Sequence, residues 1–350
     1  MSDIPAGPEH VTAAWLSSVT GWSVSGVELT EIGAGLGVSS AVYRATLTGS
    51  ACPKSVVVKL TAADQAAAFT STVLGMYRRE VEFFRRLASA APIRVPAGYH
   101  GDISDDNSQV VVVMEDLSGN RMCDQVEGMT IRDAERTVDA LAAWHARWWR
   151  DVDGLAECGA ALPLGNDVYP AMLPPLFAEG WAKLTASSEC PPPESLLDIG
   201  ARWGSAASEL LRRLDQDPVT VLHGDYRADN IMFSPEGEPI AIDFQLTHIG
   251  SAAYDLAYFI TQSITAADAS AHEQALFERW RQGLVSCGVD AADLDRAWDD
   301  YRTAALFCLA YPVIASRGMD LADPRQAGLV NTMMERYARA TEELELAELL

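Results

Sequence analysis

Residues 223–230 combine acidic and amide side chains at a spacing that suits phosphoryl transfer. They read His-Gly-Asp-Tyr-Arg-Ala-Asp-Asn, so Asp225 and Asn230 are five positions apart. In a phosphoryl-transfer loop with this spacing, the aspartate orients the acceptor hydroxyl and the asparagine holds magnesium. Magnesium is required because a nucleotide triphosphate is strongly anionic, and the ion prefers hard oxygen ligands. The alternative is a polar loop in which the spacing is accidental.

A further aspartate follows this loop at a distance that suits the same site. Two short apolar runs, separated by Ser-Pro-Glu-Gly-Glu, lead from Asn230 to Asp243. This pattern predicts a strand, a turn and a second strand, which would fold Asp243 back beside Asn230. Three oxygen-bearing side chains in this order favour a nucleotide–metal site.

A lysine and a glycine-rich stretch upstream are candidates for binding phosphate. Residues 55–60 read Ser-Val-Val-Val-Lys-Leu, which predicts a β-strand with Lys59 near its end. The alternative for Lys59 is a strand-end lysine that extends into solvent. Glycines between two predicted strands at 32–47 let backbone N–H groups approach a polyphosphate, although their spacing also suits an ordinary hairpin. The candidate nucleotide-binding residues of this stretch are Gly33, Gly35, Gly37, Ser39 and Ser40.

A predicted helix after this strand offers a partner for Lys59. Residues 77–87 place apolar side chains at a helical period. A phosphate-binding lysine is held by a glutamate in phosphoryl-transfer enzymes of this type. Glu80 is the favoured partner, and Glu82 is the competitor, which projects about 200° round the helix from it. Residues 110–117 then predict a buried strand that ends in acidic side chains.

These motifs together resemble those of a known superfamily. His-Gly-Asp at 223–225, Asn230, Asp-Phe-Gln at 243–245, Lys59 and Met-Glu-Asp-Leu at 114–117 are similar to the aminoglycoside phosphotransferase and choline kinase superfamily. Its members are protein-kinase-like enzymes that phosphorylate small molecules. Asp-Phe-Gln, with Tyr-Asp-Leu-Ala-Tyr-Phe at 254–259, looks closest to the ecdysteroid-kinase-like branch. The resemblance covers residues of about 28 to 263.

The resemblance implies an α+β, two-lobed protein-kinase-like fold with ATP between the lobes. We expect an N-terminal extension with a helix at 1–27. A nucleotide-binding N-lobe at 28–116 would have a small antiparallel sheet and one main helix, and a larger, mostly helical C-lobe at 117–350 would bind the acceptor. The roles that the resemblance implies are catalytic base for Asp225, magnesium ligands for Asn230 and Asp243, phosphate ligand for Lys59, adenine-binding backbone for Glu115 to Leu117, and a brace of the catalytic loop for Asp255.

Composition limits the class of protein further. The 350 residues contain 26 basic and 49 acidic side chains, a net charge of −23, which argues against binding nucleic acid. A cationic acceptor is compatible with this charge, and so is an acidic protein that merely stays soluble. The six scattered cysteines form no C-x-x-C pair and predict neither zinc nor a disulfide framework. We expect no signal peptide, no membrane span and a cytoplasmic location.

The C-terminal two thirds read mainly as helices. Residues 131–149 have a helical period, and His145 on the apolar face is expected to be packed in the core rather than to bind a ligand. The proline-rich stretch 151–195 is expected to be the least regular part, either a wall of the acceptor pocket or a plain surface excursion. Three more helices are expected at 271–287, 291–311 and 325–349.

We therefore predict an ATP- and Mg²⁺-dependent phosphotransferase that acts on a hydroxyl of a small molecule. The acceptor candidates are an aminoglycoside, another antibiotic, a sugar, choline and a sterol-like alcohol, and no oligomeric state is predicted. The alternative is a pseudokinase that binds a small molecule or a protein without transfer. A dinucleotide-binding enzyme is excluded because the glycine stretch precedes a strand rather than opening a helix.

Overall fold

The computed structural model describes residues 4–32 and 39–350, and the chain divides into two compact units. Unit 1 comprises Met1–Asn120, Gly154–Ala161 and Ile242–Thr247, and unit 2 comprises Arg121–Asp153, Leu162–Ala241 and His248–Leu350. The predictions for Gly33, Gly35 and Gly37 lie outside the described residues. Within the described part of the chain, no helix is both long and apolar enough to cross a membrane.

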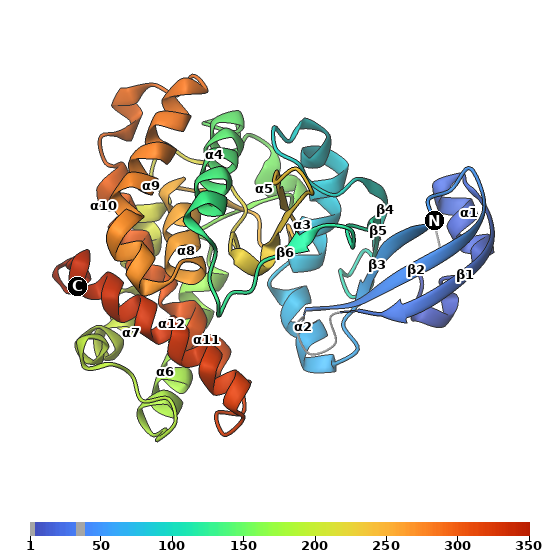
Figure 1. Cartoon of the computed structure of the whole chain (residues 1–350). Coiled ribbons are helices and arrows are strands. Elements are labelled where there is room, and N and C mark those ends of the chain that lie inside the picture. Colours follow the sequence, from blue (N-terminus) through green and yellow to red (C-terminus); the bar gives the residue numbers. More distant parts are fainter. Residues whose placement is uncertain (1–3, 33–38) are drawn as a thin grey trace. The chain divides into compact units, whose positions relative to one another are not determined.

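Unit 1 is built on a five-stranded antiparallel sheet, as predicted (Figure 1). The strand order is β1-β2-β3-β5-β4. The strands are β1 (Ser23–Glu31), β2 (Ser40–Ser50), β3 (Ser55–Thr61), β4 (Gly98–Ile103) and β5 (Val110–Glu115). The glycine-rich stretch therefore connects two neighbouring strands, β1 and β2.

The two faces of this sheet pack against different helices. Side chains alternate along a strand, so Val56, Val58 and Leu60 of β3 share one face and pack in a core with Leu16 of helix α1 (Ala13–Thr20). On the other face, Val110, Val112 and Met114 of β5 pack against helix α3 (Met76–Glu82). Lys59 alternates with Val58 and lies opposite Val112 in the register, so it projects from the α3 face.

The remaining helices of unit 1 are short. Helix α2 (Gln65–Val73) is capped by Asp64, whose side chain accepts a hydrogen bond from the Ala67 N–H group. Helix α3 continues into a π turn over Phe83–Leu87, so the predicted helix at 77–87 is present with a local widening. A short helix, α5 (Leu155–Cys158), completes this unit.

Unit 2 is mostly helical and carries two small sheets. Its helices are α4 (Ile131–Arg147), α6 (Val168–Thr185), α7 (Leu197–Leu214), α8 (Ala253–Ser263), α9 (Ala266–Ser286), α10 (Ala297–Cys308), α11 (Ala310–Ser316) and α12 (Pro324–Glu343). Its strands are β6 (Arg121–Met122), β7 (Leu162–Pro163), β8 (Thr220–Leu222), β9 (Ile231–Phe233), β10 (Pro239–Ala241) and β11 (His248–Gly250). The α+β class is confirmed, and β9 and β10 form the predicted strand–turn–strand after Asn230.

Helix α8 is the centre of unit 2. All 11 of its residues are buried, and it packs against α4, α9, α10 and α12 (Figure 1). Besides its two tyrosines, the helix has four polar or charged residues, Asp255, Thr261, Gln262 and Ser263, and buried polar groups need partners. Helix α8 must therefore bond to its surroundings, and the catalytic-loop segment supplies many of those partners.

One expectation about regularity is wrong. The stretch 151–195 contains the 18-residue helix α6, with Pro174 and Pro175 inside it. Proline inside a helix costs about 3 kcal/mol because it removes a hydrogen bond and crowds the preceding turn. Helix α6 nevertheless packs against α7 and α11 and buries Phe177 and Leu184, so tertiary packing outweighs the local preference.

Candidate active site

In unit 1 the structure brings Lys59, Glu80 and Asp243 together. The Lys59 ammonium lies 2.5 Å from Glu80 Oε1 and 3.0 Å from Asp243 Oδ1. Lys59 is only 9% exposed and Glu80 only 3%, so the cation sits between two carboxylates with little water. Burial alone would lower the pKa of Lys59, but the charges of Asp243 and Glu80 outweigh it and raise the pKa above its ordinary value.

The choice between the two glutamates is settled by this geometry. Glu80 bonds to Lys59, as predicted, whereas Glu82 accepts hydrogen bonds from Arg85 at 3.0 Å and Arg86 at 2.7 Å. The two carboxylates differ because they leave helix α3 on different sides. The predicted pairing of strand lysine and helix glutamate is confirmed, and the solvent-exposed alternative for Lys59 is wrong.

The segment that carries Asp243 is anchored within unit 1. The Phe244 ring stacks on Phe83 of the π turn with a centroid distance of 3.7 Å. Gln245 accepts a hydrogen bond from Ser39 Oγ at 2.8 Å and donates one to Asp243 Oδ2 at 3.3 Å. Asp243 itself has φ = +67°, a left-handed conformation that is rare for a residue with a side chain. Such a conformation persists where the surroundings fix it, often at functional sites.

In unit 2 the loop at 223–230 follows the buried strand β8 and is fixed by Asp255. Asp255 accepts hydrogen bonds from the backbone N–H groups of His223 at 2.7 Å and Gly224 at 2.9 Å. Gly224 has φ = +83°, which explains a glycine at the second position of the motif. The brace that the resemblance implied for Asp255 is therefore confirmed.

His145 supports the same aspartate from helix α4. Its ring is fully buried; Nδ1 accepts a hydrogen bond from Trp280 Nε1 at 3.1 Å, and Nε2 lies 3.1 Å from Asp255 Oδ2. Because Nδ1 accepts, the neutral ring carries its proton on Nε2 and donates it to Asp255. His145 is a core histidine, as predicted.

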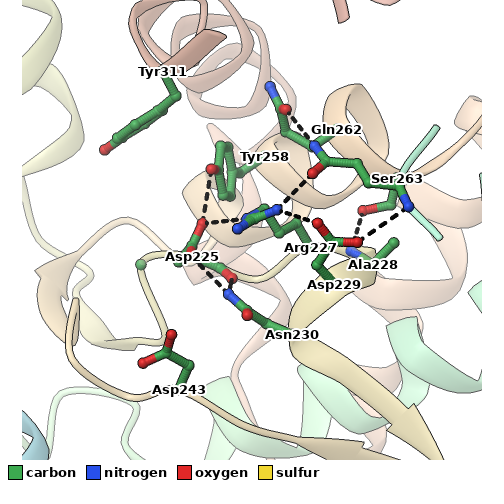
Figure 2. Close-up of polar contacts among 12 residues, drawn as sticks. Asp225, Arg227, Ala228, Asp229, Asn230, Asp243, Tyr258, Gln262, Ser263 and Tyr311 are labelled. Carbon is green, nitrogen blue, oxygen red and sulfur yellow. Dashed lines mark hydrogen bonds and ion pairs between the residues drawn. The ribbon is translucent and has the colours of Figure 1, made fainter. Parts of the chain in front are cut away.

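Asp225 lies among several hydrogen-bond donors (Figure 2). Its Oδ1 accepts from Tyr258 Oη at 2.8 Å and from Arg227 Nε at 3.0 Å. Its Oδ2 accepts from Asn230 Nδ2 at 2.7 Å, and the same amide donates to the Asp225 carbonyl at 2.9 Å. The spacing of five residues therefore does place Asp225 and Asn230 in contact.

The donor chemistry of Asn230 and Asp243 fits magnesium. Because Asn230 uses its amide nitrogen toward Asp225, its amide oxygen is the atom left to bind a cation. Asp243 offers carboxylate oxygens, so the pair supplies hard ligands of the type that Mg²⁺ prefers. Asp229 is less suited, because its oxygens accept from Gln125 N and Arg227 Nη1. Asn230 and Asp243 belong to different units, so their proximity stays a prediction.

Among the residues that the structure describes, no group of three or more His, Cys, Asp or Glu side chains forms a ready metal cage. Magnesium does not require one, because it commonly binds through one or two protein oxygens, substrate phosphates and water. The two-oxygen set fits that mode of binding.

The segment after β5 offers fewer backbone groups than the sequence suggests. The Glu115 N–H donates to the Ala97 carbonyl at 2.9 Å, and the Leu117 carbonyl accepts from Asn120. The Glu115 side chain is paired with Arg94 at 2.6 Å. The adenine-binding role of residues 115–117 stays a prediction.

The contacts of Arg227 and Tyr258 with Asp225 were not predicted. Arg227 lies in the motif at 223–230 and Tyr258 in the motif at 254–259, but no role was expected of either residue. The available signal was a polar set in helix α8: Asp255, Tyr258 and Gln262 recur at spacings of three and four. Such residues share one face of a helix and must find polar partners when buried.

Comparisons with known proteins agree with this geometry. The model of a family described as the phosphotransferase enzyme family matches residues 29–303. No curated protein sequence matches the chain. The solved structures with a similar fold include three kinases or phosphotransferases. Choline kinase from Cryptosporidium parvum is 11% identical, with 97% of this chain and 94% of that chain covered and a TM-score of 0.55.

The other two structures contain nucleotides. Spectinomycin phosphotransferase in complex with ADP and spectinomycin is 11% identical, with coverage of 95% and 97% and a TM-score of 0.55. Amicoumacin kinase in complex with AMP-PNP, Ca²⁺ and amicoumacin is 15% identical, with coverage of 89% and 87% and a TM-score of 0.53. The fold and the two residue groups thus define a kinase-like phosphotransferase. The chain belongs to the phosphotransferase enzyme family of small-molecule kinases.

Proposed function

We propose that this kinase transfers the γ-phosphoryl group of ATP to a hydroxyl of a small molecule, with Asp225 as the base. The observation that carries the proposal is the bonding of Asp225. Its carboxylate is held by Asn230, Arg227 and Tyr258 in a loop whose backbone is fixed by Asp255. A rigidly held carboxylate can orient an acceptor hydroxyl and accept its proton late in transfer.

We assign phosphate binding to Lys59. Its positive charge persists at neutral pH because Asp243 and Glu80 stabilise the ammonium. Preorganised charges of this kind stabilise the negative charge of transferring phosphoryl groups. Magnesium, held by Asn230 and Asp243, would neutralise charge on the phosphates. Relatives bound to ADP and to an ATP analogue support ATP as the donor.

The proposal keeps the domain roles and the acceptor candidates of the sequence analysis. The sheet-bearing unit would bind the nucleotide and the helical unit the acceptor, in the cytoplasm. Asp-Phe-Gln at 243–245 and the 254–259 segment support placing the chain near the ecdysteroid-kinase-like branch. An aminoglycoside, another antibiotic, a sugar, choline or a sterol-like alcohol all provide the required hydroxyl.

The test is a screen of these hydroxyl compounds by ADP release from MgATP, with the parent protein and Asp225→Asn side by side. Loss of a positioned general base costs about 10² to 10⁴ in rate. We expect Asp225→Asn to lose transfer by this factor while calorimetry shows unchanged MgATP binding. An Asp225→Asn variant within tenfold of the parent rate would contradict the assignment of the base.

A further inference from the structure

The two carboxylate oxygens of Asp225 are not equivalent. Oδ1 accepts hydrogen bonds from Tyr258 Oη at 2.8 Å and Arg227 Nε at 3.0 Å, whereas Oδ2 accepts, among the residues that the structure describes, only one side-chain bond, from Asn230 Nδ2 at 2.7 Å. A carboxylate oxygen has two principal lone-pair positions. The two donors therefore fill Oδ1, and Oδ2 keeps one position for another donor.

We infer that Arg227 and Tyr258 are positioning residues, which fill Oδ1 of Asp225 so that Oδ2 alone receives the proton of the acceptor hydroxyl. This inference rests on the proposed function, because it takes Asp225 as the base. In the step, the acceptor oxygen forms a bond to the γ-phosphorus and the bond to the β–γ bridging oxygen breaks. The hydroxyl proton passes to Oδ2, and ADP leaves with the electron pair of the broken bond.

Tyr258 is suited to be a permanent donor. Burial, with the nearby charge of Asp225, raises its pKa well above the ordinary value, so the hydroxyl stays protonated. Its ring is fixed between Tyr254, at a centroid distance of 6.4 Å, and Tyr311, at 4.9 Å. Figure 2 shows the Tyr258 hydroxyl pointing toward Asp225.

Arg227 is held just as firmly on its other side. Its Nη1 donates to Gln125 Oε1 at 2.5 Å and to Asp229 Oδ2 at 2.8 Å. Gln125 in turn donates through Nε2 to Gln262 Oε1 at 2.9 Å. The guanidinium cannot turn away from Asp225 without breaking these bonds, so it fixes the plane of the carboxylate.

Helix α8 sets the geometry of the whole loop from one face. Asp255 accepts from the backbone of His223 and Gly224, Tyr258 bonds to Asp225, and Ser263 Oγ accepts from Ala228 N at 2.9 Å. Gln262 reaches Arg227 through Gln125. A single rigid element thus fixes the loop before, at and after the base, as preorganised catalysis requires.

The experiment compares Tyr258→Phe with Tyr254→Phe, using ADP release from MgATP with water as the only acceptor and then with an acceptor from the screen. Each variant removes one phenolic hydroxyl from helix α8, but the Tyr254 hydroxyl bonds to Tyr311 and not to Asp225. Loss of a hydrogen bond to a charged group predicts a fall in kcat of about tenfold to a hundredfold for Tyr258→Phe alone. The KM for ATP should stay unchanged. Equal effects of the two variants would overturn the inference.

A double-mutant cycle separates positioning from a structural role. If Tyr258 acts through Asp225, Tyr258→Phe should cost less than about twofold in the Asp225→Asn background. If Tyr258→Phe lowered kcat by the same factor in the Asp225→Asn background as in the parent, the inference would be overturned and the proposed function would stay intact. A fully active Asp225→Asn variant would overturn both. Melting temperatures and MgATP binding by calorimetry verify that each variant is folded.

Arg227→Lys tests the second donor. Lysine keeps the positive charge but lacks the fork that bonds Asp225, Asp229 and Gln125 together. We expect a lower kcat with an unchanged KM for ATP, and again no further loss in the Asp225→Asn background. A raised KM for ATP with an unchanged kcat would make Arg227 a nucleotide ligand and overturn its positioning role.

Discussion

The two residue groups stabilise opposite charges by different means. Around Lys59, one buried cation lies between two carboxylates that come from helix α3 and from the segment after β10. Around Asp225, one carboxylate lies among a cation, a phenol and an amide. The first group is built entirely of charges, whereas the second mixes charged and neutral donors.

This difference bears on which contacts can change during catalysis. Asp243 bonds to Lys59 through Oδ1 and is also the proposed magnesium ligand, so we expect its contacts to adjust when MgATP binds. Arg227 and Asn230 donate to further partners within unit 2, and the donor bonds to Asp225 do not change in the proposal. We therefore expect the contacts within the Lys59 group to change when metal and nucleotide bind, and the donor bonds to Asp225 to persist while the Asn230 amide oxygen binds magnesium.

The largest effect that tests this contrast is expected from Asp243→Ala. Loss of a residue that only orients a metal ligand lowers metal affinity roughly 10- to 100-fold. Removing Asp243, a direct ligand, should lower the affinity for magnesium by more than that. Magnesium should then no longer improve ATP affinity, while binding of ATP without metal should persist because Lys59 is retained. Calorimetry with ATP, with and without Mg²⁺, measures both quantities.

Asp229→Asn is the matched control for this experiment. Asp229 lies one position before Asn230, but its oxygens accept from Arg227 and Gln125. The magnesium dependence of ATP binding should therefore survive in this variant. If Asp229→Asn removes it and Asp243→Ala does not, the acidic metal ligand is Asp229 rather than Asp243, and the contrast fails.

A smaller effect is expected at the other carboxylate of Lys59. Glu80→Gln removes one of the two negative charges that hold the Lys59 ammonium, so Asp243 would be its one remaining carboxylate partner. By the usual strength of a charged hydrogen bond, we expect kcat to fall about tenfold to a hundredfold. Glu82→Gln is the control, because Glu82 contacts Arg85 and Arg86 instead and should stay within about twofold of the parent. Equal losses would show that the effect comes from helix α3 as a whole.

The same contrast explains how far the site could be predicted from the sequence. Lys59 and Glu80 were found because strand alternation and helical phase determine which faces meet. Asp225 and Asn230 were found because their contact spans only five residues. Tyr258 was missed because its contact with Asp225 depends on the packing of a helix 33 residues away, which no local pattern fixes.

The fold was predictable to a similar degree. The valine-rich strands β3 and β5 and the helix α4 carry clear periodic patterns, and the structure contains them. Helix α6 was missed because Pro174 and Pro175 argue locally against a helix, whereas burial of Phe177 against neighbouring helices decides the outcome. Sequence patterns report local preferences, and tertiary packing can override them.

The smallest effect is expected at Tyr337, which is linked to Arg227 by hydrogen bonds through Gln262 and Gln125. Tyr337 Oη accepts from Gln262 Nε2 at 3.0 Å, so it lies behind Gln262 and Gln125 as seen from Arg227. Tyr337→Phe removes one neutral acceptor and should cost about 1 kcal/mol of unfolding free energy. Because several bonds separate Tyr337 from Asp225, kcat should fall by no more than about fivefold.

Thr261→Val is the control that sharpens this last prediction. Thr261 Oγ1 also donates to Tyr337 Oη, at 3.1 Å, but Thr261 has no bond toward Gln125 or Arg227. Thr261→Val should therefore lower the free energy of unfolding by a similar amount, measured by urea unfolding. Its kcat should stay within about twofold of the parent value. A Tyr337→Phe variant as slow as Tyr258→Phe would mean that Asp225 is held by the whole helical unit rather than by its immediate donors.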